Sequence, residues 1–569
     1  MVNKIVFFVV FFIILQSVKC QTYLQYLPED SNFNYNRALV YGLNVVQDTL
    51  CIGAGALDTC DGIFTNHLAQ WDGQNFHAMR NGDTDWGVVY DATSYRDTVY
   101  LCGNFESLDS VPHTGAIAAW ANGQFHSILI YDSAHNVPTF YSAITYHDTL
   151  FVGNNVLGLA SDPNNVFLSV AGYRNGEWFH VGGLQNNCFD LAVYNDELYA
   201  CSYHGLQKYS GETGNTQWQD VCLANSYTYN MVVDTINNFL YFAGDFNMAM
   251  GASSSYAVNT DYVARWNGFY LEGIGPGTLD TNYCGIGTIG FYRGYLFMSL
   301  GWSGIIHNQD IGTLIFWDGQ QWQPAVPYPY VKGIGFNKLV VYKDTLYAGG
   351  EATDTVIIGN DSIIYDDPSG YETGVKGLIR FYMPPDTTCH WLQPRVLAHA
   401  DTFYLPQGGG TVDVPLYNNN AYADSWQWDF DDGSTDTVKD PLHTYSQTGT
   451  YQVQVTVTED GCTKTAEKDI VIMEATGIAN LSLKNLSFKI YPNPTKQDFT
   501  VEISLPENIK GKNEFFVTGM GGANKYRRHL QAGFNRFVVS TTGWQPTTYI
   551  CNLMAGNKFV GSKKLVLTK

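Results

Sequence analysis

The sequence has little charge and little helix-like patterning. Only 15% of its 569 residues are Asp, Glu, Lys or Arg, which is low for a cytosolic enzyme. No long segment alternates at the period of a helix. Tyr, Phe and Trp instead make up 15% of the chain, which also holds 56 glycines, and this mix favours strands and tight turns. The composition therefore predicts an all-β protein with more than one domain.

The sequence motifs of several enzyme and metal-site classes are missing. The chain has no HExxH, no GxSxG, no P-loop and no GxGxxG between a strand and a helix. Its 13 histidines do not pair at ligand spacing, and no CxxC pair points to zinc. We therefore assign no catalytic residue, no cofactor-binding residue and no metal ligand, and we favour a protein that is not an enzyme.

Only the N-terminus has a long apolar run. Ile5–Leu15 follows a lysine and fits a signal peptide over residues 1–20, which predicts export; lipidation of Cys20 is the rival interpretation. No other stretch is long enough to cross a bilayer. Export permits disulfides, and Cys51 and Cys60 are close enough to bridge one loop. Buried free thiols are the alternative for most of the remaining cysteines.

Charge is distributed unevenly along the chain. Leu481–Lys569 contains 13 Lys and Arg residues against 4 Asp and Glu residues, a net charge of +9. The rest of the chain therefore carries −31 within the total of −22. An acidic body argues against nucleic acid or an anionic lipid surface as its partner.

A strand-like segment recurs seven times at intervals of 42 to 56 residues. Each copy has a polar pair before an apolar run, as in QDTLCIGAG from Gln47 and KDTLYAGGEA from Lys343. Five copies are followed by an Asn-Gly or Asp-Gly pair, which reaches the positive φ that both central positions of a two-residue hairpin need. These pairs are Asp72-Gly73, Asn122-Gly123, Asn175-Gly176, Asn267-Gly268 and Asp318-Gly319.

Two hairpins per copy make four strands, which is one propeller blade. We therefore expect a seven-bladed β-propeller over residues 21–388. The seventh copy lacks its last strand, and the N-terminal segment TYLQYL is the candidate that closes the ring. The period, the Trp elements and Gly349-Gly350 resemble kelch-type propellers and the central domain of galactose-oxidase-like proteins. This resemblance implies the architecture only.

A second domain is expected over residues 389–474. Its sequence contains WDFDDG, then PLHTY, then GTYQV, and TYQVQVTVT alternates as a half-buried strand does. These patterns resemble a PKD domain, which is an immunoglobulin-like sandwich, and the resemblance implies structural roles for the matching residues. They are Trp428, Asp429, Phe430, Asp432, Gly433, Pro441, His443, Tyr445, Gly449, Tyr451 and Val453.

One turn of this domain is crowded with carboxylates. It holds Asp429, Asp431, Asp432 and Asp436, and Asp431 stands where the family usually has Gly. Oxygen-rich turns can bind calcium, whereas Asp side chains can also hydrogen-bond backbone amides. Since no regular ligand spacing is visible, we expect amide bonding and no cofactor, with calcium as the alternative.

The last domain is expected over residues 481–569. It begins with KIYPNPTKQDFTV and ends with GSKKLVLTK, and it closely resembles the C-terminal sorting domain of type IX secretion in Bacteroidetes. The resemblance implies a small β-sandwich that the secretion machinery recognises, and hence a protein that is secreted or attached to the outer cell surface. An ordinary third β-domain is the alternative. The matching residues are Tyr491, Pro492, Asn493, Pro494, Phe499, Val501, Gly543, Tyr549, Gly556, Lys563, Lys564 and Leu565.

We therefore expect a secreted or cell-surface binding protein of the adhesion type. Its propeller would be a platform for an extracellular glycan or protein, with the PKD domain as a spacer or second binding module. The rival class is a propeller-based glycan hydrolase or lyase. Such an enzyme predicts two or three carboxylates converging at one mouth of the central channel.

Overall fold

The computed structural model describes most of the chain after residue 23. The described residues are 24–27, 39–55, 57, 59–79, 87–111, 114–128, 139–154, 157–159, 162–167, 169–182, 184, 187–203, 205–211, 218–252, 257–268, 270–276, 279, 285–306, 309–359, 361–364, 377–384, 389, 391–398, 400–406, 410–420, 423–474, 487–506, 509, 511–518, 524–541, 544, 548–555 and 558–568. The signal peptide expected over residues 1–20, and Cys284, Gly543 and Gly556, lie outside them.

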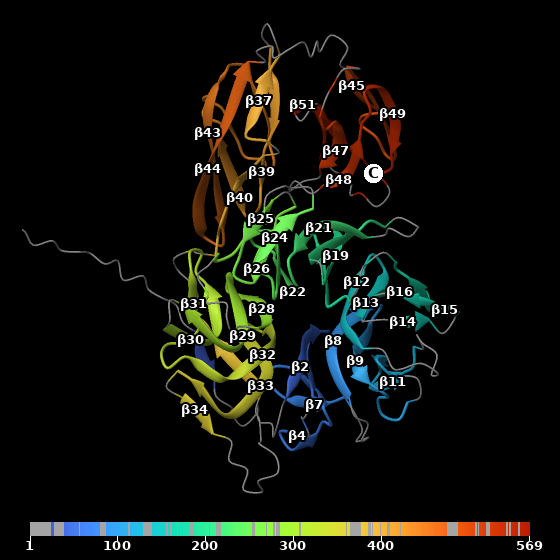
Figure 1. The fold of residues 1–569 in the computed structure, drawn as a ribbon, viewed down its shortest axis with the longest axis vertical. Helices are drawn as coiled ribbons and strands as arrows, with labels where there is room; N and C mark the ends of the chain where they lie inside the picture. Colours follow the sequence, from blue (N-terminus) through green and yellow to red (C-terminus); the bar gives the residue numbers. More distant parts are fainter. Residues whose placement is uncertain are drawn as a thin grey trace, which may run out of the picture.

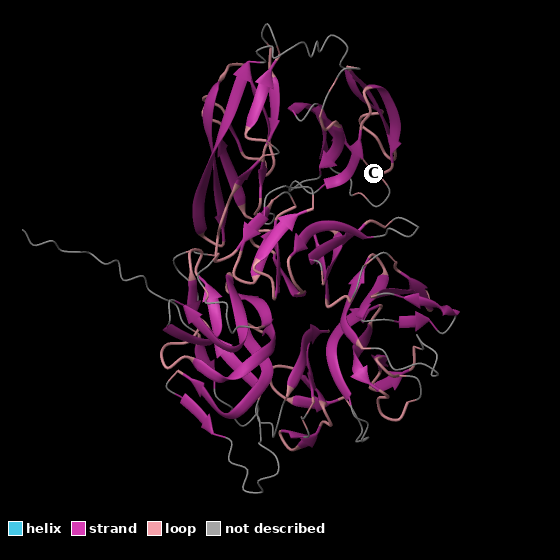
Figure 2. Ribbon diagram, in the orientation of Figure 1, coloured by secondary structure: helices cyan, strands magenta, loops and turns pink. Residues whose placement is uncertain are grey.

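The structure is all-β, as predicted. Figure 2 shows strands and loops but no helix within the described ranges. Accordingly, no membrane-spanning helix is found in that part of the chain.

Seven antiparallel sheets, numbered here 1 to 7, form the first part of the molecule. Sheet 1 contains β2 (Val40–Val46), β3 (Thr49–Ala54), β6 (Leu68–Trp71) and β7 (Phe76–Ala78); sheet 2 contains β8 (Gly87–Tyr95), β9 (Thr98–Phe105), β10 (Ile117–Ala121) and β11 (Gln124–His126); sheet 3 contains β12 (Phe140–Tyr146), β13 (Thr149–Asn154), β16 (Val170–Arg174) and β17 (Glu177–His180). Sheet 4 contains β18 (Asp190–Tyr194), β19 (Glu197–Ser202), β20 (Gly205–Tyr209) and β21 (Trp218–Ala224); sheet 5 contains β22 (Thr228–Asp234), β23 (Phe239–Gly244), β26 (Val263–Trp266) and β27 (Leu271–Gly273). Sheet 6 contains β28 (Ile286–Tyr292), β29 (Tyr295–Ile306), β30 (Gln309–Trp317) and β31 (Trp322–Pro324); sheet 7 contains β32 (Val331–Tyr342), β33 (Thr345–Ile358), β35 (Leu378–Tyr382) and β1 (Gln25–Leu27).

The seven sheets are arranged as a closed ring (Figure 1). The first strand of each sheet contacts the first strand of the next, in the order β2, β8, β12, β18, β22, β28, β32 and back to β2. Strand β1 pairs with β35, with Gln25 opposite Tyr382, so sheet 7 holds both ends of the ring. The N-terminal segment thus supplies the strand that the seventh copy lacks, as predicted.

Two sheets are larger than the four strands expected for each copy. The hairpin β24 (Met248–Gly251) and β25 (Ala257–Asn259) leaves sheet 5 between β23 and β26 and pairs with β21, which extends sheet 4 to six strands. In sheet 7, β34 (Asp361–Ile364) pairs with β33 as an additional strand. Both additions are insertions between the second and third strands, so they change the outside of the ring and leave its inner strands in order.

The repeated polar pair forms a two-residue turn between the first and second strands of six sheets. Both turn residues have positive φ, which suits the twist of a tight hairpin. The pairs are Gln47-Asp48, Arg96-Asp97, His147-Asp148, Asn195-Asp196, Arg293-Gly294 and Lys343-Asp344. Sheet 5 instead has a longer turn, in which Asp234 Oδ1 accepts the amides of Ile236 and Asn237.

A tyrosine before this turn bonds each of five sheets to its neighbour. The Tyr342 hydroxyl donates to the carbonyl of Asp48 at 2.8 Å, which joins sheet 7 to sheet 1. The same bond runs from Tyr95 to Asp148, Tyr146 to Asp196, Tyr194 to Asn238 and Tyr292 to Asp344. The repeated tyrosine therefore makes a contact between copies, because in five cases the turn of one sheet accepts the tyrosine hydroxyl of the preceding sheet.

Three of the five predicted Asx-Gly hairpin turns are wrong. Asn122-Gly123 and Asn175-Gly176 have positive φ at both positions, as predicted. At Asp72, Asn267 and Asp318 four residues separate the strands, and positive φ occurs at the glycine but not at the preceding Asp or Asn. The side chain of each Asp or Asn instead accepts loop amides, for example those of Gln74 and Asn75 at 2.7 Å in the first case.

The cysteine prediction also needs correction. Cys51 and Cys60 are not bridged; both are buried free thiols, and burial raises their pKa values to about 12. Five further cysteines are buried and free, in agreement with the alternative. The disulfide present in the described residues joins Cys389 to Cys462 and packs against the core of the second domain.

The second domain is a sandwich held on the rim of sheet 5. Its core surrounds the fully buried Trp428. Asn237, in the long turn of sheet 5, donates from Nδ2 to the carbonyl of Trp391 at 2.7 Å and accepts the amide of Gln393 at 2.8 Å. Asn419 returns a bond to the carbonyl of Asn237 at 2.8 Å. The strands are β36 (Val396–Leu397), β37 (Thr402–Leu405), β38 (Val412–Pro415), β39 (Tyr417–Asn418), β40 (Ser425–Asp429), β41 (Thr435–Asp436), β42 (Leu442–Tyr445), β43 (Gly449–Glu459) and β44 (Cys462–Glu474).

The last domain packs two sheets around its own core. One sheet is ordered β45-β46-β49 and the other β48-β47-β50-β51. A hydrogen bond of 2.9 Å between the hydroxyls of Tyr417 and Thr518, both buried, joins it to the second domain. Its strands are β45 (Ser487–Tyr491), β46 (Phe499–Leu505), β47 (Glu514–Thr518), β48 (Asn524–His529), β49 (Gly533–Val539), β50 (Thr548–Ala555) and β51 (Lys558–Val566).

Candidate functional site

Aromatic side chains line one mouth of the ring, at the end where the first strands begin. In five sheets an aromatic residue lies at or near the start of the first strand, and in four of these sheets it is the extra residue of a β-bulge. Two further tyrosines, from the turn after β19 and the segment before β22, continue the row. We call this set the aromatic arc: Tyr41, Tyr90, Tyr141, Phe189, Tyr229, Tyr227 and Tyr203.

The rings of the aromatic arc form one continuous series. Consecutive centroids lie 6.1, 6.0, 5.5, 5.4, 5.8 and 4.4 Å apart, within the range in which aromatic rings contact one another. Tyr203 and Tyr227 are exposed, at 40% and 38%, and the other five are half-buried. The arc therefore offers aromatic surface to solvent from sheet 1 to sheet 5.

Carboxylates hold two of the arc's hydroxyl groups. Tyr229 donates to Asp245 at 2.6 Å, and Tyr41 is hydrogen-bonded to Glu351. Burial, and then these carboxylates, raise the pKa of both phenols, so both remain neutral donors at ordinary pH. These bonds fix the rings at Tyr41 and Tyr229 in position.

Two aspartates lie just inside the mouth, one residue after arc positions. Asp91 accepts the amides of Ala92 and Ala143, and Asp190 accepts those of Leu191 and Met231, so each carboxylate bonds its own sheet to the next. Burial raises the pKa of both, that of Asp190 to about 6, and the positive charge of Lys338 opposes the shift in each case. The oxygens of both carboxylates therefore accept hydrogen bonds that join neighbouring sheets of the ring.

The carboxylate turn of the second domain is bonded to backbone and to one histidine. Asp432 accepts the Ser434 amide at 3.0 Å and contacts His443 Nε2 at 2.7 Å. Burial raises the pKa of Asp432, but the Ser434 and His443 hydrogen bonds outweigh it and hold the pKa below its usual value. Asp429 accepts the Asp431 amide at 2.9 Å.

The substitution of Gly by Asp at position 431 has a clear local reason. Asp431 has a φ of 59°, in the left-handed region that Asp tolerates better than most residues. Its side chain also accepts the amide of Gln452 at 2.9 Å, a bond that Gly cannot make. No group of three or more His, Cys, Asp or Glu side chains within the described ranges is placed to hold a metal ion. Calcium binding at this turn stays an untested alternative.

The remaining residues of the second-domain pattern surround this turn. Phe430 stacks on His443 at a centroid distance of 3.9 Å, and the Tyr445 hydroxyl donates to the Phe430 carbonyl at 3.0 Å. Gly433 has a φ of 89°, and Gly449 begins the long strand β43, on which Tyr451 packs against Tyr445. The pattern thus builds one packed corner of the sandwich.

In the last domain, the Pro-Asn-Pro segment is clamped to the chain end. The Asn493 side chain donates to the Lys564 carbonyl at 2.6 Å and accepts the Val566 amide at 2.8 Å. Thr495 continues the contact as a parallel bridge to Leu567. Two halves of the motif, more than 70 residues apart in the sequence, therefore meet in space.

The other motif residues of this domain divide between core and surface. Phe499, Val501, Tyr549 and Leu565 are buried in its core. Outside the core, Tyr491 donates to Glu502 at 2.5 Å, while Pro492 and Pro494 flank Asn493 in the turn and Lys563 and Lys564 are exposed. Lys563 Nζ also lies 5.8 Å from the centre of the Phe488 ring.

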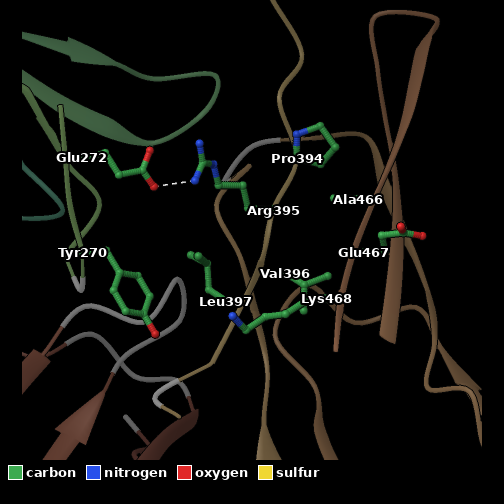
Figure 3. Close-up of a pocket in the computed structure, with 9 residues that line it drawn as sticks. All are labelled: Tyr270, Glu272, Pro394, Arg395, Val396, Leu397, Ala466, Glu467 and Lys468. Atoms are coloured by element: carbon green, nitrogen blue, oxygen red, sulfur yellow. Dashed lines mark hydrogen bonds and ion pairs between the residues drawn. The ribbon is translucent and has the colours of Figure 1, made fainter. Parts of the chain in front are cut away.

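A small pocket lies at the junction of the ring and the second domain (Figure 3). It encloses about 390 Å³ and takes residues from sheet 5, from the segment at Arg395 and from β44. Arg395 and Arg265 both pair with Glu272, and the Tyr270 hydroxyl donates to the Ala398 carbonyl at 2.5 Å. Because its charged groups near Glu272 are paired across the junction, the pocket acts as part of the joint between domains.

Two family models match the chain. Residues 412–473 match the PKD domain, and residues 489–568 match the secretion system C-terminal sorting domain. Residues 489–568 are a type IX sorting domain. The sorting domain makes this a secreted protein, of a kind often attached to the outer cell surface, and it gives the chain the secretion machinery as a partner. The PKD domain prediction is likewise confirmed.

No curated protein matches the chain. Among solved structures, the chain is similar to YjhT, with 11% identity, coverage of 49% of this chain and 94% of that one, and a TM-score of 0.27. It is also similar to the FN1–FN3 domains of chicken CNTN1, with 10% identity, 42% and 99% coverage and a TM-score of 0.13. It is similar as well to fibronectin(III)-like modules of Clostridium thermocellum CbhA, with 10% identity, coverage of 30% of this chain and 94% of that one, and a TM-score of 0.12. These scores are too low to carry an argument about fold or function.

Proposed function

We propose that residues 21–388 are a seven-bladed β-propeller of kelch-like type and that the chain is a binding protein of the adhesion type. In this proposal the propeller holds an extracellular glycan or protein at the aromatic arc. Residues 1–20 are the signal peptide, residues 389–474 the PKD domain, and residues 481–569 the sorting domain. The seven sheets in cyclic contact and the shared strand of sheet 7 support the propeller.

The single observation that carries the binding role is the aromatic arc. Closure of the ring has its own contacts at the opposite end, where tyrosine hydroxyls bond to the next turn. The arc adds aromatic surface at the other mouth, where Tyr203 and Tyr227 are exposed to solvent. Exposed aromatic clusters on a rigid scaffold are typical of recognition surfaces.

A glycan-degrading enzyme is the weaker alternative. It needs carboxylates free to give and take protons at the mouth. Asp91 and Asp190 are instead bonded to main-chain amides of two sheets each, and Asp245 holds a tyrosine hydroxyl. These roles fit a scaffold rather than acid–base chemistry.

The position of the PKD domain supports a role as a fixed spacer. It is bonded to sheet 5 through Asn237 and Asn419, on the rim of the ring. In Figure 1 it lies beside the ring, next to the strands of sheet 5.

The test is a binding assay with the full chain and a panel of polysaccharides and purified surface proteins. We expect at least one to bind, and the Tyr203→Ala/Tyr227→Ala double variant to lose that binding. Tyr328→Ala is the matched control, because Tyr328 is 74% exposed and lies outside the arc. Binding that survives in the double variant contradicts the proposal. Release of reducing sugar ends by the full chain would instead favour the enzyme.

A further inference from the structure

We infer that the aromatic arc is a site for a linear, uncharged glycan, which crosses the mouth of the ring and leaves it over sheets 6 and 7. This inference rests on the proposed function, because it names the ligand class of the same site. It depends on the shape of the mouth, on the chemistry of its aromatic surface and on its charge.

The shape of the mouth is asymmetric. In sheets 6 and 7 the bulge positions that carry aromatic residues elsewhere are occupied by Gly287 and Asn337. Next to them, the Gly301 amide donates to the Gly285 carbonyl at 2.6 Å, and no atom lies within 4 Å of a Cβ added at Gly285. Among the described residues, the aromatic wall therefore has a gap at sheets 6 and 7, where a glycine and an asparagine stand in place of aromatic rings. A chain ligand longer than the arc requires such an exit, whereas a compact ligand does not.

The chemistry of the arc suits sugar rings. Each pyranose has an apolar face of C–H groups and a rim of hydroxyls, and a tyrosine offers an apolar ring with a polar tip in the same way. Tyr227 and Tyr229 lie nearly parallel, with 12° between their planes, and so form a flat platform at one end of the arc. A row of rings on one wall fits a repeating ligand, because successive sugars can contact successive rings.

The charge of the mouth selects against acidic glycans. Glu351 lies at one end of the arc and Asp245 beside Tyr229 toward the other, both exposed, and Asp91 and Asp190 lie just inside the mouth. Lys338 is the cation whose charge acts on the two inner aspartates. The body of the chain is also strongly acidic. Uronic acid or sulfate groups would meet this negative field, whereas neutral sugars would not.

The experiment compares neutral and acidic hexasaccharides by titration calorimetry with the full chain. The neutral probes are cellohexaose and β-1,4-mannohexaose, and the acidic probe is hexagalacturonate. We expect a neutral hexasaccharide to bind, and the acidic one to bind at least about tenfold more weakly at low salt. Added salt should narrow the difference, because it screens charges that are exposed at the mouth.

Three variants locate the bound chain. Tyr203→Ala and Tyr227→Ala should each weaken neutral-hexasaccharide binding about tenfold, which corresponds to about 1.4 kcal/mol. Gly285→Trp should block the gap and also weaken it, since Gly285 has open space and no positive φ. Tyr328→Ala should bind normally. If Gly285→Trp does not fold by circular dichroism, the two tyrosine variants decide the matter.

The inference is overturned if no neutral hexasaccharide binds, if hexagalacturonate binds equally well, or if all arc variants bind normally. These results remain distinct from failure of the proposed function. A protein ligand that is lost in the Tyr203 and Tyr227 variants would sustain the binding platform and reject the glycan. Absence of any ligand at the arc would reject both.

Discussion

Replacement of Gly123 tests the predicted hairpin turns in isolation from packing. Gly123 has a φ of 74°, and nothing lies within 4 Å of a Cβ added there. A side chain at this position therefore meets no neighbour, and its cost comes from the backbone alone. Placing an L-residue in the left-handed region costs roughly 1–2 kcal/mol, and a β-branched residue fits it worst. We expect Gly123→Val to lower the free energy of unfolding of the ring by about 2 kcal/mol.

The assay is urea unfolding of the full chain, followed by tryptophan fluorescence, with two comparison variants. Gly285→Val is the matched control, because that site is equally open but has no positive φ, and it should cost less than about 0.5 kcal/mol. Gly123→Asn should recover most of the loss, since Asn tolerates positive φ. Equal costs for Val at positions 123 and 285 would refute the backbone argument.

Three further predictions concern ring closure, pH and export. Tyr342→Phe removes the hydroxyl that joins sheet 7 to sheet 1 and should cost about 0.5–1.5 kcal/mol in urea unfolding, whereas a larger loss from Tyr328→Phe would contradict this role. Folding raises the pKa of Asp190 to about 6, so the stability that its protonated form contributes is fully present below the pKa of an unfolded Asp and is lost as the pH rises through 6. The free energy of unfolding of the wild type should therefore fall by up to about 3 kcal/mol between pH 4 and 7 relative to that of Asp190→Asn. Parallel pH profiles of the two proteins would contradict this prediction. Deletion of residues 481–569 should leave a folded protein in the periplasm, and cell fractionation that finds it in the medium at the wild-type level would reject the sorting role.

The sequence predicted the repeat well because each copy contains its own turn chemistry. The pairs at Arg96-Asp97 and Lys343-Asp344 form hairpin turns within their copies, and β1 completes sheet 7. The predicted two-residue turn at Asp72 was wrong because an Asp-Gly pair can also begin a four-residue loop. In this loop the Asp72 side chain accepts the amides of Gln74 and Asn75. A two-residue turn and a four-residue loop differ only in the register of the strand that follows, which an Asp-Gly pair does not specify.

The aromatic arc could not be predicted with the same ease. Tyr41, Tyr90 and Tyr141 lie near the start of apolar strands, where an aromatic residue is ordinary core material. A signal was present, since Tyr or Phe recurs just before Gly42, Asp91, Ser142, Asp190 and Asn230 in successive copies. That the rings reach the solvent depends on the bulges, which exist only once the strands are paired.

The Cys389–Cys462 disulfide was equally hidden. The two residues are 73 positions apart, and neither belongs to a short cysteine motif such as CxxC. Their pairing follows from the sandwich, because the segment at Cys389 and the start of β44 pack on one core. Motifs such as Tyr491–Pro494 were predictable because each needs only its own sequence, although the Asn493 clamp to β51 needed the fold.

Tyrosine footprinting tests the central claim that the mouth of the ring is the binding site. The full chain is oxidised by hydroxyl radicals with and without saturating neutral hexasaccharide, and modified tyrosines are read by mass spectrometry. The account predicts protection of Tyr203 and Tyr227, with Tyr328 modified equally in both samples. Unchanged modification of Tyr203 and Tyr227 in the saturated sample would contradict it.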